Sequence, residues 1–172
     1  WPQETPVPFA ETILYQDEHI LVADKPHFLP VIPAGRFVQQ SLLVRLKKST
    51  GIDTLSPVHR IDKDTAGLVL FSVNHASRDA YQALFRSRAV LKTYHAIAAA
   101  LDQQHWPLHY RSRLVEDEQF FRTREVPGEP NSETMIRVLQ QNAGLALYAL
   151  QPVTGRKHQL RVQLAALGAP IV

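Results

Sequence analysis

The chain has 172 residues, of which 45% are hydrophobic and 20% are charged, and it contains no cysteine. This composition predicts a globular protein with a sizeable core and excludes a largely disordered chain. The lack of cysteine excludes disulfides, thiolate nucleophiles and cysteine-bound metals, and a cytoplasmic location is expected. No apolar stretch in the sequence approaches the length of a membrane span.

The net formal charge of +3 is unevenly distributed along the sequence. Between residues 56 and 113, eight lysines and arginines stand against four acidic residues, whereas residues 114–172 carry six of each. An electropositive surface around the basic segment would attract a polyanion. A solvated face with ordinary ion pairs is the alternative, and from charge alone it is the better supported of the two.

The first half of the chain predicts alternating strands and short helices. Apolar clusters around a polar turn predict a β-hairpin over residues 13–23, and a proline-rich loop follows at 26–35. Ser41 is expected to open a short amphipathic helix. After a strand at 66–73, Asn74 is expected to cap a helix with an apolar face made of Ala76, Ala80, Leu84 and Phe85.

The second half of the chain is mostly strand. Residues 91–98 alternate between two faces, with Lys92 and Tyr94 on one side. Further strands are predicted at 108–115, 119–126, 134–139 and 144–151. A helix is expected at 154–168, with Leu160, Leu164 and Leu167 as its buried stripe and Gly168 at its end. The predicted fold class is therefore α+β, a mixed and mainly antiparallel sheet flanked by helices in one domain.

The most informative segment is His59-Arg60-Ile61-Asp62, which precedes the apolar run at 68–71. It places an imidazole, a guanidinium and a carboxylate within four positions, a combination suited to chemistry on an anionic substrate. Taken alone the tetrapeptide is weak evidence, because similar runs occur in phosphoryl-transfer loops and in plain surface turns. Its context is more specific, since Pro57 and Gly67 constrain the backbone on both sides.

The predicted last helix begins with three basic residues, Arg156, Lys157 and His158. Cations in a first helical turn oppose the helix dipole, whose positive end favours anions. We therefore expect these side chains, together with free backbone N–H groups, to receive a phosphate or a carboxylate. In the alternative interpretation the side chains reach solvent, and a cost of about a few tenths of a kcal/mol is tolerated.

Three motifs, taken in order and spacing, resemble those of the RluA-type pseudouridine synthases. The motifs are His59-Arg60-Ile61-Asp62 with Thr65 and Gly67, Lys92-Thr93-Tyr94, and the run from Gly155 to Arg161. The opening 13–22 with Asp24-Lys25-Pro26 is also similar to the first strand pair of that family. The resemblance implies a catalytic domain over residues 13–172, truncated at its C-terminus, after an N-terminal extension at 1–12. A fragment of a longer protein is accordingly expected.

The resemblance implies an activity, the isomerisation of a uridine to pseudouridine within structured ribosomal or transfer RNA. It also implies that the reaction needs no metal and no organic cofactor. By similarity Asp62 is the catalytic carboxylate, and it either adds to the sugar or removes a proton from it. Either route needs the carboxylate ionised. Arg161 matches the basic partner of that carboxylate in the family.

Further roles follow from the same resemblance. Tyr94 matches the catalytic-site aromatic that packs on the target uracil, a contact suited to an extruded base. The residues expected to bind RNA are His59, Arg60, Thr65, Arg156 and Lys157. Arg60 resembles the residue that enters the space left by the flipped nucleotide, and His59 is expected to order the loop rather than to exchange protons. Gln163 stands where histidine is frequent in this family.

Two other functional classes stay open at the level of sequence. A non-catalytic RNA-binding module would use the same basic surface but would not need Asp62, because a carboxylate that faces RNA is repulsive. A phosphodiesterase would use His59 and Asp62 as acid and base. Such an enzyme normally shows a second histidine or a carboxylate cluster for metal, and neither is evident in the sequence.

Overall fold

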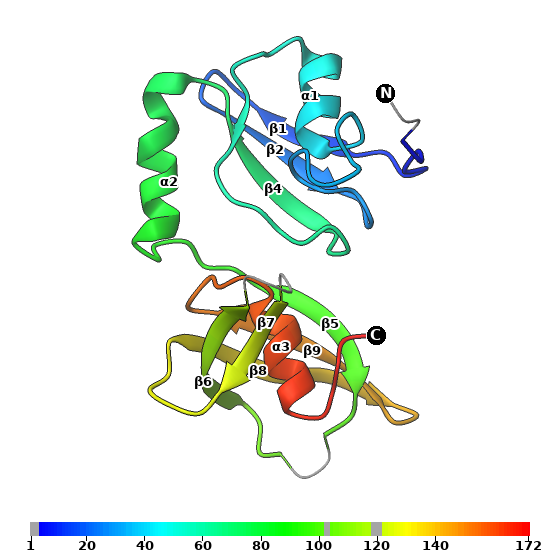
Figure 1. Ribbon diagram of the computed structural model, residues 1–172, viewed down its shortest axis with the longest axis vertical. Helices are drawn as coiled ribbons and strands as arrows, with labels where there is room; N and C mark the ends of the chain where they lie inside the picture. The colour runs from blue at the N-terminus through cyan, green and yellow to red at the C-terminus, as the bar shows by residue number, and fades with distance from the viewer. Residues whose placement is uncertain (1–3, 102–103, 118–121) are drawn as a thin grey trace. The chain divides into compact units, whose positions relative to one another are not determined.

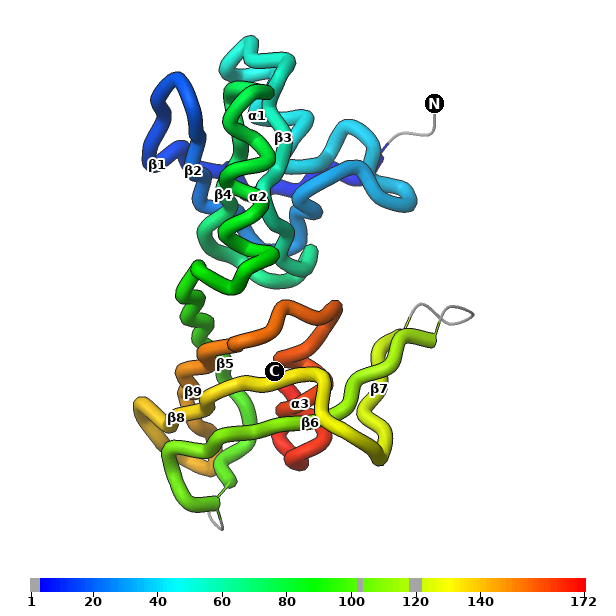
Figure 2. The backbone as a smooth tube through the Cα atoms, turned by 90° about the vertical axis from the view of Figure 1, so that its left-hand side faces the viewer, coloured from blue at the N-terminus to red at the C-terminus, as the bar shows by residue number. Residues whose placement is uncertain are grey.

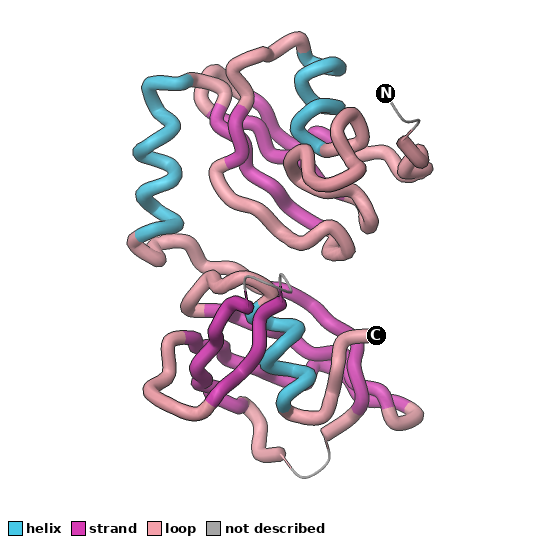
Figure 3. Tube along the Cα trace, in the orientation of Figure 1, coloured by secondary structure: helices cyan, strands magenta, loops and turns pink. Residues whose placement is uncertain are grey.

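The computed structural model describes residues 4–101, 104–117 and 122–172. The chain forms two compact units, residues 1–89 and residues 90–172. Each unit has its own sheet and its own hydrophobic core (Figures 1 and 3). The predicted α+β class with mainly antiparallel strands is confirmed, although the described strands form two sheets where one was expected. Within the described ranges no helix is long and apolar enough to cross a membrane.

The first unit is built on a four-stranded sheet in which every described pair of strands is antiparallel. The strand order is β1-β2-β4-β3, with β1 at Thr12–Gln16, β2 at Ile20–Lys25, β3 at Ser56–Pro57 and β4 at Gly67–Ser72. The predicted hairpin and the predicted strand before Asn74 are therefore confirmed. The strand β4 lies between β2 and β3, so the segment that follows the H-R-I-D motif is central to this sheet.

Helix α1, Leu42–Thr50, supplies the second layer of the first core (Figure 1). Its Leu42 and Leu46 are fully buried against Leu21 and Phe71 of the sheet, as i,i+4 spacing on one helical face requires. Ser41 is the N-cap residue, which confirms the predicted start. Gly51 ends the helix in the left-handed conformation.

The helix predicted after Asn74 differs from the expectation in two ways. The Asn74 side chain accepts a hydrogen bond from the Ala76 N–H at 2.9 Å, but it caps a short 3₁₀ turn, His75–Ser77, before α2 begins at Arg78–Arg86. The expected apolar face is not buried, and Leu84 is 44% exposed. Periodicity shows which residues share a face, whereas burial depends on whether another element covers that face.

Lys25, at the end of β2, is fully buried although it carries a charge. Its Nζ donates to the carbonyl oxygens of Pro26 at 2.9 Å, Leu29 at 2.7 Å and Lys63 at 3.0 Å. These three acceptors satisfy the three N–H donors of the ammonium group. The lysine therefore fastens the loop after β2 to the loop that contains Asp62.

Burial lowers the pKa of Lys25 from its ordinary value of 10.5 to about 8, because the charged form loses solvation. The carboxylates of Asp64 and Asp62 act in the opposite direction and favour the charged form. Two acidic side chains of the H-R-I-D loop thus interact electrostatically with a buried cation.

The second unit is built on a five-stranded antiparallel sheet. The strand order is β5-β9-β8-β6-β7, with β5 at Tyr94–Ala99, β6 at Leu108–Asp117, β7 at Arg122–Val126, β8 at Ser132–Asn142 and β9 at Leu145–Pro152. All five predicted strands are found, and β6 and β7 form a hairpin at one edge (Figure 2). The first three residues of the predicted strand 119–126 lie outside the described residues.

Helix α3, Gln159–Ala166, is shorter than predicted and starts later. Arg156, Lys157 and His158 therefore precede the helix instead of forming its first turn, and His158 is the N-cap residue with φ of 54°. The end is as expected: Gly168 has φ of 88°, and the Ala169 N–H donates to the Leu164 carbonyl at 2.9 Å. This hydrogen bond and the left-handed Gly168 form a Schellman-type C-terminus.

The buried face of α3 is partly polar. Gln163 is 1% exposed, and its Oε1 accepts from the Thr134 hydroxyl at 2.6 Å. Its Nε2 donates to the hydroxyl oxygens of Ser112 at 3.1 Å and Ser132 at 3.2 Å. One amide thus binds side chains from both β6 and β8, beside the fully buried apolar residue Leu164.

Gln159 repeats this arrangement one turn earlier. Its Nε2 donates to the Thr134 hydroxyl at 2.9 Å and to the Glu133 carbonyl at 3.1 Å, and its Oε1 accepts from the Thr154 hydroxyl at 2.7 Å. We call these hydrogen-bonded residues the α3 polar network: Ser112, Ser132, Thr134, Thr154, Gln159 and Gln163. Because its members bind one another, the cost of burying them is offset, and the helix is held in one register on the sheet.

We predict that Gln163→Met lowers the free energy of unfolding by about 2 kcal/mol. The substitution keeps the length of the side chain but removes the acceptor of the Thr134 hydroxyl in a buried site. Urea denaturation followed by the fluorescence of Trp106, whose ring packs against Tyr148 in the same unit, measures the change. The matched control is Gln151→Met, which removes an exposed amide, and a similar loss in both variants would contradict the prediction.

We predict that Lys25→Met costs on the order of 3 kcal/mol of stability, because three carbonyls lose their donor in a site without solvent. Lys47→Met is the control, since Lys47 also donates to a backbone carbonyl, that of Asp53, but at an exposed site. Chemical denaturation followed by circular dichroism measures both variants. An equal loss of stability in both variants would show that the buried hydrogen bonds of Lys25 stabilise the fold no more than the exposed one of Lys47.

Comparison of wild type with Lys25→Met also reports the titration of Lys25. Its pKa in the folded state, about 8, lies below the ordinary 10.5, so the unfolded chain holds more protons between these two pH values. Stability that depends on Lys25 therefore rises as the pH increases through this window. The difference between wild type and Lys25→Met is expected to grow from pH 8 to pH 10.5, and a flat difference would argue against the lowered pKa.

Candidate functional site

Asp62 begins a tight turn in the loop between β3 and β4. Its carbonyl oxygen accepts the N–H of Thr65 at 3.1 Å, which closes a four-residue turn with aspartate in the position that turns favour. Lys63 and Asp64 are exposed at the tip and form an ion pair at 3.4 Å. Asp62 itself is half-buried, so its carboxylate lies in a less solvated environment than its two neighbours.

Other parts of the first unit fix this turn from behind. Ile61 packs against the first hydrophobic core, and Lys25 Nζ donates to the carbonyl of Lys63. The Nδ1 atom of His27 lies 2.7 Å from the carbonyl oxygen of Asp64. The backbone is therefore bound at the two residues that follow Asp62, and an apolar contact fixes the residue that precedes it. A carboxylate on such a backbone is preorganised.

His59 connects the same loop to two secondary structure elements. Its Nε2 accepts the N–H of Leu70 in β4 at 3.2 Å, and its ring stacks on Phe85 of α2 with centroids 4.6 Å apart. A nitrogen occupied in this way is poorly placed to exchange protons with a substrate, and the geometry supports the loop-ordering role expected of His59. Arg60 is exposed beside it.

Tyr94 and the basic segment before α3 come from neighbouring parts of the second unit. Because β5 and β9 are antiparallel, with Tyr94 opposite Leu150, the start of β5 lies near the end of β9, where the chain turns toward α3. The Nζ atom of Lys92 approaches within 3.4 Å of the position that a Cβ atom would take at Gly155. Tyr94 is half-buried and packs against the second core.

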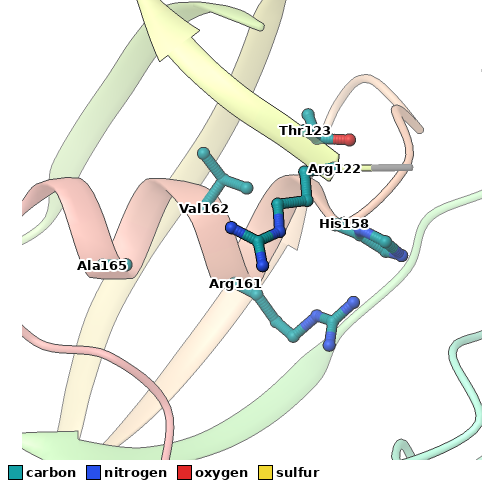
Figure 4. A pocket seen from close by; sticks show the side chains of 6 residues that line it. All are labelled: Arg122, Thr123, His158, Arg161, Val162 and Ala165. Carbon is teal, nitrogen blue, oxygen red and sulfur yellow. The ribbon is translucent and has the colours of Figure 1, made fainter. Parts of the chain in front are cut away.

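An open pocket of about 400 Å³ lies beside the start of α3. It is lined by Arg122, Thr123, His158, Arg161, Val162 and Ala165 (Figure 4). Arg161 projects from the helix, and Arg122 comes from β7 at the edge of the sheet. Two guanidinium groups and an imidazole on one small surface favour a phosphate or a carboxylate there.

Arg156 and Lys157 are exposed, but each also contacts the second unit itself. Arg156 Nε donates to the carbonyl of Asn131 at 2.8 Å, and Lys157 Nζ lies 3.8 Å from a carboxylate oxygen of Glu116. The conflict with the helix dipole that the sequence predicted does not arise, because both residues precede the helix. The anchored guanidinium of Arg156 still presents further donors to solvent.

The structure thus assigns the predicted residues to two groups. His59, Arg60, Asp62 and Thr65 share one loop of the first unit, while Tyr94, Arg156, Lys157 and Arg161 lie near the start of β5 and the start of α3 in the second. Sequence reasoning missed Arg122, which reaches the pocket only because β7 lies beside α3. Among the described residues, no group of three or more His, Asp or Glu side chains is arranged to hold a metal ion.

Comparison with known proteins gives a family match that extends over both units. The profile of the RNA pseudouridylate synthase family matches residues 19–166. The chain is 31% identical to ribosomal large subunit pseudouridine synthase C of Vibrio cholerae, over 92% of this chain and 50% of that protein. It is 33% identical to tRNA pseudouridine(31) synthase of Saccharomyces cerevisiae, over 93% of this chain and 44% of that protein.

A solved structure agrees with these relatives. Human RNA pseudouridylate synthase domain containing 4 superimposes with a TM-score of 0.72 at 32% identity, over 92% of this chain and 66% of that one. The chain spans about half the length of the curated relatives named above. The resemblance to RluA-type synthases inferred from the motifs is confirmed. The chain belongs to the RNA pseudouridylate synthase family.

Proposed function

We propose that the protein isomerises specific uridines to pseudouridine in structured RNA, with Asp62 as the catalytic carboxylate and with no metal or organic cofactor. The observation that carries the proposal is the family match combined with the turn that holds Asp62, fixed by Lys25 and His27 through backbone carbonyls. The named relatives act on ribosomal RNA in one case and transfer RNA in the other. Both classes of RNA are therefore candidate substrates.

The reaction conserves the atoms of the nucleotide. The bond between the ribose anomeric carbon and the uracil ring nitrogen breaks, the base turns, and a ring carbon bonds to the anomeric carbon in its place. That ring carbon then loses its proton, and the former glycosidic nitrogen gains one. Asp62 serves this sequence either by adding to the anomeric carbon or by removing a proton from the sugar, and both roles need a positioned, ionised carboxylate.

Tyr94 and Arg161 complete the proposed catalytic set. The aromatic ring of Tyr94 packs on the extruded uracil, and its half-buried position leaves part of the ring available for that contact. Arg161 supplies the positive charge that accompanies the carboxylate during the reaction. Arg122, which lines the same pocket, offers a further guanidinium group for an anionic group of the RNA.

The remaining residues bind RNA in this proposal. Arg60 enters the space vacated by the flipped nucleotide, as its exposed position permits. Thr65 contacts RNA from the loop that His59 orders, while Arg156 and Lys157 contact backbone phosphate. Residues 13–172 then act as one catalytic domain after an N-terminal extension at 1–12, and the absence of cysteine supports a cytoplasmic location.

We predict that Asp62→Asn lowers turnover by about 10²- to 10⁴-fold or more, while RNA affinity stays similar or rises slightly. The substitution preserves size but removes the charge that performs the chemistry. Tritium release from ribosomal and transfer RNA labelled at the uridine ring carbon, prepared from cells that lack the gene, measures turnover. The matched control is the exposed neighbour Asp64→Asn, expected to be nearly as active as wild type because its carbonyl, and not its carboxylate, holds the turn. Turnover retained in Asp62→Asn would remove this residue from the mechanism.

Basic residues near α3 are expected to separate binding from catalysis. Arg156→Ala and Lys157→Ala should weaken RNA binding and each lower the slope of log affinity against log salt by about one unit. The single-turnover rate at saturating RNA should stay nearly intact in both variants. Arg161→Met should instead reduce that rate with little change in the salt slope, since its charge serves the reaction.

The comparison of these three variants tests the assignments directly. Affinity is measured against salt concentration, and the single-turnover rate is measured at saturating RNA. Lys157 is expected to give the smaller change of the two binding variants, because Glu116 already compensates part of its charge. A salt slope that falls for Arg161→Met, but not for the other two, would reverse the proposed roles.

A further inference from the structure

The loop after β2 holds a large aromatic residue in an unfavourable backbone conformation. Phe28 has φ of +66°, in the left-handed region that bulky side chains rarely adopt. The cost of such a conformation is of order 1–3 kcal/mol for a residue other than glycine. A glycine would accept the same backbone without strain. The phenyl ring at this position therefore contributes something that offsets the strain.

Core packing does not explain the ring of Phe28. The next residue, Leu29, is fully buried, and its carbonyl is bound by Lys25, so the backbone here is held firmly. The Phe28 side chain is 52% exposed. The strained residue thus turns its large apolar ring toward solvent while its neighbour fills the core.

Two further rings lie close to the ring of Phe28. The Phe9 ring lies 6.2 Å away between centroids and is also exposed, and the His27 ring lies 5.9 Å away. We call Phe9, His27 and Phe28 the aromatic patch. His27 approaches the carbonyl oxygen of Asp64 within 2.7 Å, so this patch lies beside the turn that begins at Asp62.

The neighbouring charges indicate what kind of molecule the patch would receive. Lys63, next to Asp64 in the turn, is exposed and forms an ion pair with the Asp64 carboxylate at 3.4 Å. Lys63 and Arg36 both lie over the ring of Phe37, which is not a member of the patch. Aromatic faces next to cations suit a chain that alternates flat bases with phosphates. Stacking on a protein ring is tolerant of sequence, because each base has a π-face.

We propose that Phe28 is a stacking platform for an unpaired nucleobase of the RNA, one that flanks the uridine being modified. This role rests on the proposed function, since the patch adjoins the Asp62 turn. The bond from Lys25 to the Leu29 carbonyl fixes the backbone that carries the ring, so little backbone entropy is lost when a base stacks on it. The tilted rings of Phe9 and His27 add aromatic surface next to it.

The test uses the full-length protein and two fluorescent stem-loop RNAs, one with an unpaired uridine loop and one with abasic sites in that loop. Phe28→Leu removes the ring but keeps an apolar side chain, and it should bind the uridine loop roughly 5- to 150-fold more weakly. Its affinity for the abasic loop should stay within about twofold of wild type. Phe28→Tyr should bind both RNAs like wild type, because it keeps the ring.

Tyr15→Leu is the matched control, because Tyr15 is also 52% exposed but lies on β1. Its loss should leave both affinities unchanged. Phe28→Gly tests folding separately, since it relieves the positive φ and is expected to unfold at no lower temperature than Phe28→Leu. A folded Phe28→Gly that binds the uridine loop as weakly as Phe28→Leu supports the platform.

Three results would overturn the proposal. They are an unchanged affinity of Phe28→Leu for the uridine loop, an equal loss for the abasic loop, and self-association of the wild type that is abolished in Phe28→Leu, which would make the patch a protein contact. Pseudouridine formation by the wild type is assayed in parallel. If Phe28→Leu loses base-dependent binding but the wild type forms no pseudouridine, the proposed function is rejected and Phe28 remains a base-stacking residue. If the wild type forms pseudouridine normally but Phe28→Leu binds the uridine loop as well as wild type does, the stacking role is rejected and the proposed function remains.

Discussion

The second unit depends on hydrogen bonds buried between α3 and its sheet. Apolar packing alone allows a helix to slide or rotate on a sheet at modest cost, because dispersion contacts are not directional. The amides of Gln159 and Gln163 remove that freedom, since their bonds to Thr134 and its neighbours form at one position only. Arg161 lies between these two glutamines in the sequence, and its place in the pocket follows from the register that they impose.

The first unit solves a similar problem with a cation. Loops that carry functional residues have many backbone carbonyls and few apolar side chains, so they cannot be fixed by hydrophobic contacts alone. Lys25 places one ammonium group where three such carbonyls converge. Both units therefore use fully bonded polar side chains inside the core to hold the segments that the reaction is proposed to need. A polar group in a core can define a single geometry more sharply than an apolar one.

Much of the fold was predictable from sequence because period-two patterns and turn residues are local signals. The longer strands of both sheets, the start of α1 and the end of α3 follow from such patterns, whereas the two-residue strand β3 was not predicted. The start of α3 did not, because the Thr154 hydroxyl binds both the Glu133 N–H and Gln159 Oε1, and these contacts delay the helix. The contact between Glu133 and Thr154 joins residues 21 positions apart, which no local pattern reveals.

The candidate site likewise combines residues that local motifs predict with residues that only the tertiary structure reveals. The motifs predict Asp62, Tyr94 and Arg161 by resemblance, but Arg122 could be found only from the structure, which shows that β7 lies beside α3. One missed residue did carry a signal. Lys25 continues the buried alternation of Leu21 and Ala23 along β2, and a lysine on a buried face implies acceptors close to it.

The binding of three backbone carbonyls by Lys25 also has an evolutionary consequence. The ammonium group recognises carbonyl oxygens at Pro26, Leu29 and Lys63, and every amino acid provides a carbonyl. Side chains in the two loops are thus free to vary for reasons of substrate choice without loosening the attachment of the Asp62 turn. Substitutions on the loop surfaces can therefore change what these loops contact, while the buried side chain of Lys25 preserves their placement.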